Sequence, residues 1–171
     1  GRTTGAEPHM YYYRRFVNYR KWTPWEKVDL DIQGDYLIPA VVNKRLFLFW
    51  PVFTEVPDDA SNDDIAYPEP DAGTKMSTLK GFKRLRMQMA VSDYRQDKWT
   101  PKRVSKDFAE SGSFNVEILK KNYCFYPIDR SGVDDRFGIT YNGTSYGSDK
   151  TSCAQLSGSF EINGCKGVPE I

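Results

Sequence analysis

Two short apolar runs, Tyr36–Val42 and Leu46–Phe53, lie only three residues apart in this chain of 171 residues. Nearly every position of both runs is apolar, which is typical of strands that are covered on both faces. Asn43 and Lys44 follow the first run, and asparagine tolerates the positive φ that a two-residue hairpin turn requires. The sequence therefore predicts a tight antiparallel pair in the middle of a sheet, with Trp50 on a buried face.

The rest of the chain also reads as short strands separated by turn residues. Aromatic residues make up 15% of the chain and favour strands, whereas its 13 glycines and 10 prolines favour turns. Phe82–Ser92 alternates in polarity and places Arg84 and Arg86 on a wet face, which indicates an outer strand. Asn142-Gly143, between two strand-like runs, is a strong hairpin signal. These features predict an all-β fold of antiparallel hairpins.

Two segments of the chain resemble each other. Asn18–Val28 reads NYRKWTPWEKV and Asp93–Val104 reads DYRQDKWTPKRV, so both carry Tyr-Arg followed by Lys-Trp-Thr-Pro. Their tryptophans are 77 residues apart, or 54 without the acidic insertion described below, close to the ~40–50 residues of a propeller blade. We expect propeller-like blades in an incomplete ring; the alternative is a β-sandwich with two unrelated tripeptides. The residues expected to mark the repeat are Trp22, Pro24, Trp25, Trp50, Trp99 and Pro101.

Residues 58–80 interrupt the strand pattern with acidic and turn-forming residues. The acids are Asp58, Asp59, Asp63, Asp64, Glu69 and Asp71. Oxygen ligands at this density suit calcium, but the spacing of an EF-hand loop is absent, so a solvated loop is the favoured interpretation. We therefore expect a single all-β domain or fragment over residues 1–171, with repeat boundaries near 22 and 99 and an exposed acidic insertion at 58–80.

Composition argues against several classes of function. The chain has 24 Lys and Arg against 23 Asp and Glu, which gives no general argument for nucleic-acid binding. His9 is the only histidine and no Cys-x-x-Cys pair exists, so neither a metal nor a cofactor is expected. For Cys124, Cys153 and Cys165 we expect buried free thiols, with a Cys153–Cys165 bridge as the alternative. No apolar run is long enough for a transmembrane helix.

Several motifs resemble those of Tc (toxin complex) toxin A subunits, in the region called neuraminidase-like. The residues that carry the resemblance are Gly1-Arg2-Thr3, Pro8-His9, Tyr11–Arg14, Trp22–Val28, Ile32, Gly34-Asp35, Asn43, Arg45, Phe49-Trp50, Phe53–Glu55 and Ser92–Ser105. The resemblance implies sialidase-like blades in a secreted or cell-surface, pore-forming toxin subunit. Such subunits assemble as pentamers, work with cargo and linker subunits, and enclose a translocation channel in a shell.

The resemblance further implies that this region helps to keep the shell closed until the pH changes. Charges that could form such a lock are Glu26, Asp29, Asp31 and Asp35 near the first repeat, and Arg84 and Arg86 near the second. Single surface ion pairs contribute only about 0–1 kcal/mol, so many would have to act together. The simpler alternative is that these side chains are solvated and have no partner.

Two other functions remain open at this point. Arginines interleaved with aromatics, as at Tyr13–Arg15, could bind a glycan by stacking, although such residues are more often cross-strand contacts. Sialidase catalysis needs an arginine cluster facing a tyrosine–glutamate pair. The sialidase motif Ser-x-Asp-x-Gly-x-Thr-Trp is absent from the chain. We therefore expect no enzyme activity and no pocket in which three arginines face a Tyr–Glu pair.

Overall fold

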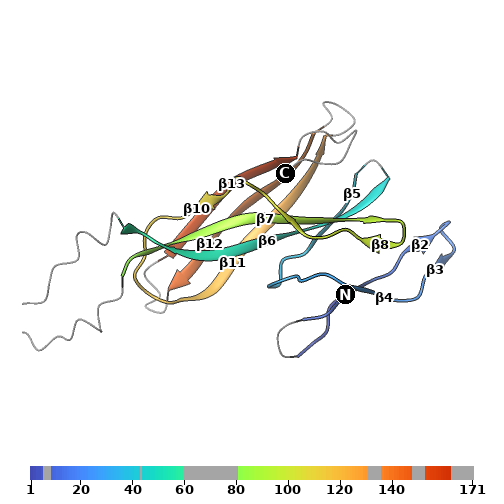
Figure 1. Ribbon diagram of the computed structural model, residues 1–171, viewed down its shortest axis with the longest axis horizontal. Coiled ribbons are helices and arrows are strands. Elements are labelled where there is room, and N and C mark those ends of the chain that lie inside the picture. The colour runs from blue at the N-terminus through green and yellow to red at the C-terminus, as the bar shows by residue number, and fades with distance from the viewer. Residues whose placement is uncertain (6–8, 43, 60–80, 131–135, 148–152, 163–171) are drawn as a thin grey trace, which may run out of the picture. The chain divides into compact units, whose positions relative to one another are not determined.

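The computed structural model describes residues 1–5, 9–42, 44–59, 81–130, 136–147 and 153–162. In these ranges the chain is built of antiparallel strands, so the predicted all-β fold is confirmed (Figure 1). The sequence predicts one domain or fragment, whereas the contacts define two compact units. The first unit contains Gly1–Val52 and Met89–Val104, and the second contains Phe53–Gln88 and Ser105–Ile171.

Thirteen strands are described, and they form four sheets. In chain order they are β1 (Tyr11–Tyr13), β2 (Phe16–Val17), β3 (Lys21–Trp22), β4 (Glu26–Val28), β5 (Ile38–Val42), β6 (Arg45–Pro57), β7 (Lys83–Arg95), β8 (Lys98–Trp99), β9 (Arg103–Val104), β10 (Ala109–Glu110), β11 (Ile118–Arg130), β12 (Arg136–Gly147) and β13 (Cys153–Ile162). The largest sheet has the order β10-β7-β6-β5, and β8 and β9 also pair with β7. β1 pairs with β4, β2 with β3, and β12 lies between β11 and β13.

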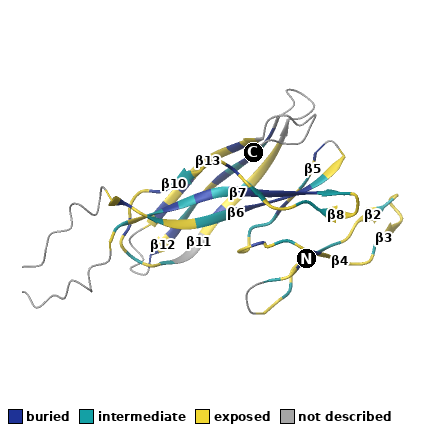
Figure 2. Ribbon diagram, in the orientation of Figure 1, coloured by how far each residue is buried: buried dark blue, intermediate teal, exposed yellow. Residues whose placement is uncertain are grey.

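The hairpin predicted from the two apolar runs is confirmed. β5 and β6 pair antiparallel, with Ile38 opposite Phe49 and Val42 opposite Arg45. Within β6 the residues from Phe47 to Trp50 are all buried, so both faces of this strand are covered as expected (Figure 2). Asn43, which was predicted to form the turn, lies outside the described residues.

The prediction that both apolar runs are covered on two faces is wrong for β5. Ile38 and Val42 are buried, but Pro39 is exposed and Val41 is 64% exposed. Successive side chains of a strand point to opposite faces, and only the face of β5 that carries Ile38 and Val42 reaches the core. An apolar side chain can remain on the wet face of an edge strand, and the sequence alone does not distinguish that case from burial.

The prediction that Phe82–Ser92 forms an outer strand is also wrong. β7 pairs with β6 on one side and with β8, β9 and β10 on the other, so it lies inside its sheet. The alternation itself was predicted correctly, because Leu85 and Met87 are fully buried while Arg84 and Arg86 are partly exposed. Several very short strands share one edge of β7, and such strands have no clear signal in a sequence.

Asn142-Gly143 does not form the predicted hairpin turn. β12 passes straight through it, with Gly143 opposite Tyr123 of β11 and Leu156 of β13. A β-carbon at Gly143 would lie 2.6 Å from Tyr123 Cα and closer still to the Asn122 carbonyl oxygen. Gly143 is therefore required for the close approach of two strands, a second common role of glycine in sheets.

Each tryptophan of the repeated segments lies on the returning strand of a tight hairpin in the first unit. Trp22 in β3 pairs with Phe16 of β2, and Trp99 in β8 pairs with Tyr94 of β7. Each hairpin tip contains two residues with positive φ, which allows a short loop to turn sharply. The first tip is one residue longer, so Tyr19 lies in a tip whereas Tyr94 lies in a strand.

The threonine after each tryptophan closes its hairpin in the same way. The amide of Thr23 donates to the Arg15 carbonyl at 2.8 Å, and the Arg15 amide donates to Thr23 Oγ1 at 2.9 Å. The amide of Thr100 donates to the Asp93 carbonyl at 2.9 Å, and the Asp93 amide donates to Thr100 Oγ1 at 3.0 Å. The chain thus uses one local motif twice, while its role as a blade boundary stays a prediction.

Two expectations for polar residues of the second unit are wrong. Asp58, expected in an exposed loop, is buried because its carboxylate accepts from Arg84 Nη2 at 2.7 Å and from Ser113 Oγ. Cys124 and Cys153, expected to be buried, are exposed because they lie on the outward side of their strands. Residues 60–80 and Cys165 lie outside the described residues.

Candidate functional site: an aromatic cleft in the first unit

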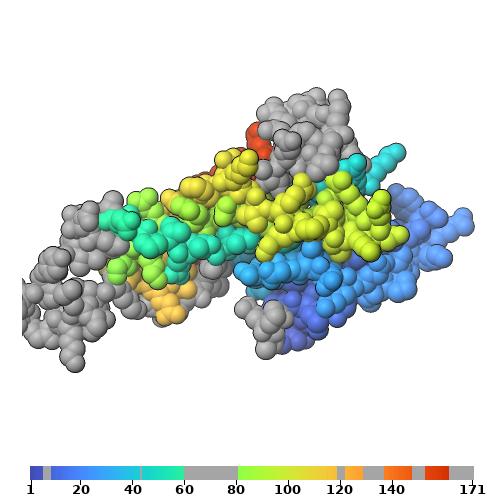
Figure 3. Space-filling model, viewed as in Figure 1, coloured from blue at the N-terminus to red at the C-terminus, as the bar shows by residue number. Residues whose placement is uncertain are grey.

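A cleft of about 760 Å³ lies within the first unit. We call it the aromatic cleft, because six of its lining residues are aromatic: Tyr12, Tyr13, Trp22, Trp25, Tyr94 and Trp99. Its charged lining residues are all cationic: Arg14, Arg15, Lys44 and Arg45. Figure 3 shows the yellow-green residues around β8 next to the blue N-terminal residues, and both segments contribute residues to this lining.

One wall of the cleft is a layer of rings and a guanidinium group. Arg14 Cζ lies 4.3 Å from the ring centre of Trp22 and 4.7 Å from that of Trp25, within the range of cation–π attraction. Phe16 packs on Trp22 with ring centres 4.9 Å apart. Both tryptophans nevertheless remain 54% exposed. This wall therefore presents aromatic surface to solvent, whereas the sequence indicated these tryptophans only as markers of the repeat.

Glu26 accepts hydrogen bonds from the phenol groups of two tyrosines that line the cleft. The β1–β4 register places Tyr13 opposite Glu26, and Tyr13 Oη donates to Glu26 Oε2 at 2.5 Å. Tyr94 Oη donates to the same oxygen at 3.4 Å, and Arg15 Nη2 lies 3.9 Å from Oε1. The Trp99 ring packs edge-on against both tyrosine rings, with centres 5.5 and 5.2 Å away. Glu26 is thus an internal bonding partner rather than a freely solvated charge.

The phenol of Tyr13 is held in its protonated form. Burial raises the pKa of Tyr13 well above its ordinary value, and the hydrogen bonds with Glu26 and Tyr94 raise this pKa further. A phenolate at this position would lose solvation and would face the Glu26 carboxylate. The pair therefore has the composition of a sialidase nucleophile and its base, but its environment favours the neutral phenol.

The expectation that no pocket places three arginines against a Tyr–Glu pair stays a prediction. Arg14, Arg15 and Arg45 line the aromatic cleft together with Tyr13, but Glu26, the hydrogen-bond partner of Tyr13, is not among the lining residues. The three arginines have different surroundings, because Arg14 covers tryptophan rings while Arg15 approaches Glu26. The register between β1 and β4 places Tyr13 opposite Glu26. Both strands are short, and sequence patterns predict short strands less reliably than long ones.

Tyr13 gives a testable pH dependence. The unfolded chain releases its phenol proton near pH 10, whereas the folded chain retains it, so Tyr13 contributes stability that is lost as pH rises above about 10. Tyr13→Phe should therefore make the free energy of unfolding fall less steeply between about pH 9.5 and 11.5, as measured by urea denaturation. Tyr19→Phe is the control, because Tyr19 is 94% exposed. Equal slopes for both variants would contradict the assignment.

The charges predicted to form a pH lock mostly bond within the chain. Asp31 accepts from Lys102 Nζ at 3.1 Å, and Asp35 pairs with Arg2. In the second unit, Arg86 Nη2 lies 2.6 Å from Glu110 Oε1, and Arg84 is bound by Asp58. Asp58 also raises the pKa of the Arg84 guanidinium through its hydrogen bond and charge. Asp29 is exposed and makes no ion pair with the described residues.

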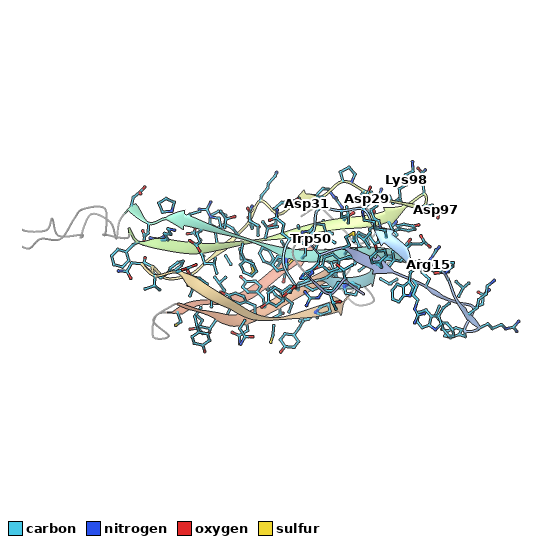
Figure 4. All side chains as sticks on the ribbon, turned by 90° about the horizontal axis from the view of Figure 1, so that it is seen from below. Arg15, Asp29, Asp31, Trp50, Asp97 and Lys98 are labelled. Atoms are coloured by element: carbon cyan, nitrogen blue, oxygen red, sulfur yellow. The ribbon has the colours of Figure 1, made fainter. Side chains whose placement is uncertain are left out.

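Figure 4 locates the labelled residues of the first unit. Trp50 lies among the packed side chains, whereas Asp97 and Lys98 lie at the outer end of the β7–β8 hairpin. In the part of the chain that the structure describes, no group of three or more His, Cys, Asp or Glu side chains could hold a metal ion. No helix in those residues is long and apolar enough to cross a membrane.

Comparison with known proteins defines the family. A search of curated protein sequences finds no match to the chain. The profile of the family described as Neuraminidase-like domain matches residues 1–129, which include the whole first unit, all lining residues of the aromatic cleft and both repeated segments. On this match over three quarters of its length, the chain belongs to the neuraminidase-like domain family.

Proposed function

We propose that this chain is a non-catalytic structural segment of a Tc-type toxin A subunit, in the shell that surrounds the translocation channel. The observation that carries the proposal is the family match over residues 1–129. It covers the residues, from Gly1 to Ser105, that carry the resemblance to Tc toxin A subunits. The partners under this proposal are the other protomers of a pentamer and, through the complete protein, cargo and linker subunits. The location is outside the producing cell or on its surface.

The chemistry of the Tyr13–Glu26 pair supports the non-catalytic part of the proposal. A tyrosine nucleophile must give up its proton, and burial, the largest cause of the raised pKa of Tyr13, opposes that loss here. Arg14 is engaged by two tryptophan rings and Arg15 approaches Glu26, so these two cations have partners inside the protein. The same contacts would make the first unit a rigid building block.

Hydrolysis of a fluorogenic sialoside tests this part directly. We expect the purified chain to release fluorophore no faster than buffer does, and Tyr13→Phe to give the same rate. A rate above buffer that disappears in Tyr13→Phe would overturn the non-catalytic proposal and would favour a working glycosidase, with Tyr13 as the nucleophile and Glu26 as its base.

The gating role depends on charges that remain available to another protomer. Asp29 meets this condition among the predicted lock residues, because it is exposed and makes no ion pair with the described residues. In the complete subunit we expect Asp29→Asn to move the midpoint pH of channel opening, measured by conductance in lipid bilayers. Asp97→Asn is the control, since it removes the same charge from an exposed hairpin tip. An identical shift, or no shift, in both variants would remove Asp29 from the lock.

A further inference from the structure

Residues 14–22 form a hairpin around β2 and β3 that gathers positive charge at the surface, and we call it the cationic hairpin. Its four cations are all exposed: Arg14, Arg15, Arg20 and Lys21. The sequence has no aspartate or glutamate between Glu7 and Glu26. Arg15 lies 3.9 Å from Glu26, whereas the other three cations make no ion pair with the described residues. The cationic hairpin therefore keeps most of its charge without internal counterions, in a chain whose net charge is only +1.

The cationic hairpin also exposes aromatic side chains. Tyr19 at its tip is 94% exposed, the most of any large hydrophobic side chain that the structure describes. Phe16 and Trp22 lie opposite each other on the two strands, and they remain 48% and 54% exposed although their ring centres are only 4.9 Å apart. Apolar surface that is gathered in one place, rather than scattered singly, is typical of a site that meets a protein or a membrane.

Backbone hydrogen bonds hold the cationic hairpin in one shape. The Thr23 amide donates across its base at 2.8 Å, and the Arg20 amide donates to the Val17 carbonyl at 3.1 Å. At the tip, Asn18 and Tyr19 have φ values of 51° and 52°, which turn the chain sharply. β2 and β3 lie at the outer end of the first unit (Figure 1). The tip therefore projects with its backbone already ordered, which lowers the entropic cost of binding.

We propose that the cationic hairpin docks the domain on an anionic phospholipid bilayer, with Tyr19 and Phe16 at headgroup depth and Arg20 and Lys21 on the lipid phosphates and carboxylates. Aromatic side chains favour the membrane–water interface. Clustered lysine and arginine are attracted to the negative surface potential of a bilayer that contains phosphatidylserine. The shell role does not require such a surface, so the inference goes beyond the proposed function.

A bilayer fits the cationic hairpin better than a nucleic acid does. Bases stack on open ring faces, but Arg14 Cζ lies 4.3 Å from the ring centre of Trp22 and Phe16 packs on the same ring. A nucleic-acid strand also needs a basic surface that follows its phosphates, whereas these four cations are confined to one hairpin. A bilayer accepts the exposed parts of the rings at a projecting tip, and salt limits its attraction to charges within about 8 Å.

Co-sedimentation of the purified chain with lipid vesicles tests the proposal. One set of vesicles is phosphatidylcholine alone, and the other contains equal parts of phosphatidylserine and phosphatidylcholine. We expect at least ten-fold tighter binding to the mixed vesicles, and this binding should weaken as salt is added because salt screens the attraction. Soluble glycerophosphoserine and a short oligothymidylate serve as competitors, and neither should displace the chain at a concentration equal to that of the accessible lipid.

Substitutions in the cationic hairpin identify the docking surface. Arg20→Glu with Lys21→Glu should weaken binding to the mixed vesicles at least ten-fold. Tyr19→Asn should weaken it at least three-fold, because asparagine tolerates the positive φ but removes the exposed ring. Lys27→Glu with Lys98→Glu is the matched control, because both lysines are exposed, lie in the first unit and make no ion pair with the described residues.

Circular dichroism establishes that all variants keep their β structure. Each of the following results would overturn the proposal: no binding to the mixed vesicles, equal binding to phosphatidylcholine vesicles, displacement by either competitor, unchanged binding of Tyr19→Asn, or an equal loss of binding in the lysine control pair.

Discussion

Gly143→Ala should destabilise the β11–β12–β13 sheet by about 3 kcal/mol, the upper part of the range for overpacking a well-packed site. The new β-carbon would lie 2.6 Å from Tyr123 Cα and closer to the Asn122 carbonyl oxygen. Both neighbours are backbone atoms in a paired strand, so relief requires the strands to separate. Tyr123 is buried, with its hydroxyl bonded to Ser145 and to the Ala154 carbonyl, which restricts that movement.

Gly138 provides the control for this prediction in the same strand. A β-carbon there would meet only the Phe160 carbonyl oxygen, at an ordinary 3.5 Å. Because alanine restricts the unfolded chain more than glycine, Gly138→Ala should be neutral or stabilising by up to about 1 kcal/mol. Urea unfolding measured by circular dichroism separates the two cases. Equal stability of the two variants would mean that the close strand approach at Gly143 is wrong.

Asp93→Asn should destabilise the first unit by about 2–3 kcal/mol, the upper part of the range for hydrogen bonds that involve a charged group. The Asp93 carboxylate is 1% exposed, accepts from Thr100 Oγ1 at 2.8 Å and pairs with Arg95 Nε. A second arginine lies nearby, with Arg103 Nη2 3.6 Å from Oδ1 of the Asp93 carboxylate. An asparagine of the same shape removes the charge that both arginines face and turns one acceptor into a donor.

The control for Asp93 is Asp97→Asn, which makes the same chemical change four residues further along the chain. Asp97 is exposed at the hairpin tip with φ near 60°, a conformation that asparagine also tolerates. We expect the free energy of unfolding of the Asp97→Asn variant to stay within about 0.5 kcal/mol of the wild-type value, as for most surface substitutions. If Asp93→Asn were as mild as Asp97→Asn in thermal and urea unfolding, the buried charge cluster would not stabilise the hairpin.

The sequence predicted the parts of the fold that depend on local pattern. The β5–β6 hairpin followed from two apolar runs and their short connection, and the alternation of β7 followed from its period of two. In both Lys-Trp-Thr segments the tryptophan lies on the returning strand of a hairpin and the threonine closes that hairpin with the same two hydrogen bonds. These features depend on residues that are close together in the chain, so they can be predicted from the sequence alone.

The errors concern pairings between distant segments. Asn142-Gly143 has the composition of a turn, but its glycine is required by a strand some twenty residues earlier in the chain. Asp58 was expected in solvent because its neighbours are acidic, yet its partners are Arg84 and Ser113, 26 and 55 residues away. Local composition cannot report such partners.

The aromatic cleft was only partly predictable for the same reason. The stretch around Arg14 shows an arginine among aromatics, and both glycan binding and cross-strand packing agree with that pattern. The structure places Arg14 on two tryptophans and leaves much of both rings exposed. Glu26 was expected as a surface charge, whereas the β1–β4 register brings it to Tyr13. Both outcomes depend on registers between very short strands.

Electron cryomicroscopy of the protein expressed from its complete gene tests the shell proposal most directly. We expect a ring of five protomers in which this neuraminidase-like domain forms part of a wall around a central channel. The domain should contact a neighbouring protomer through charged residues, with Asp29 among them. A monomeric protein, or a domain that projects freely into solvent without contacting another protomer, would overturn the shell proposal.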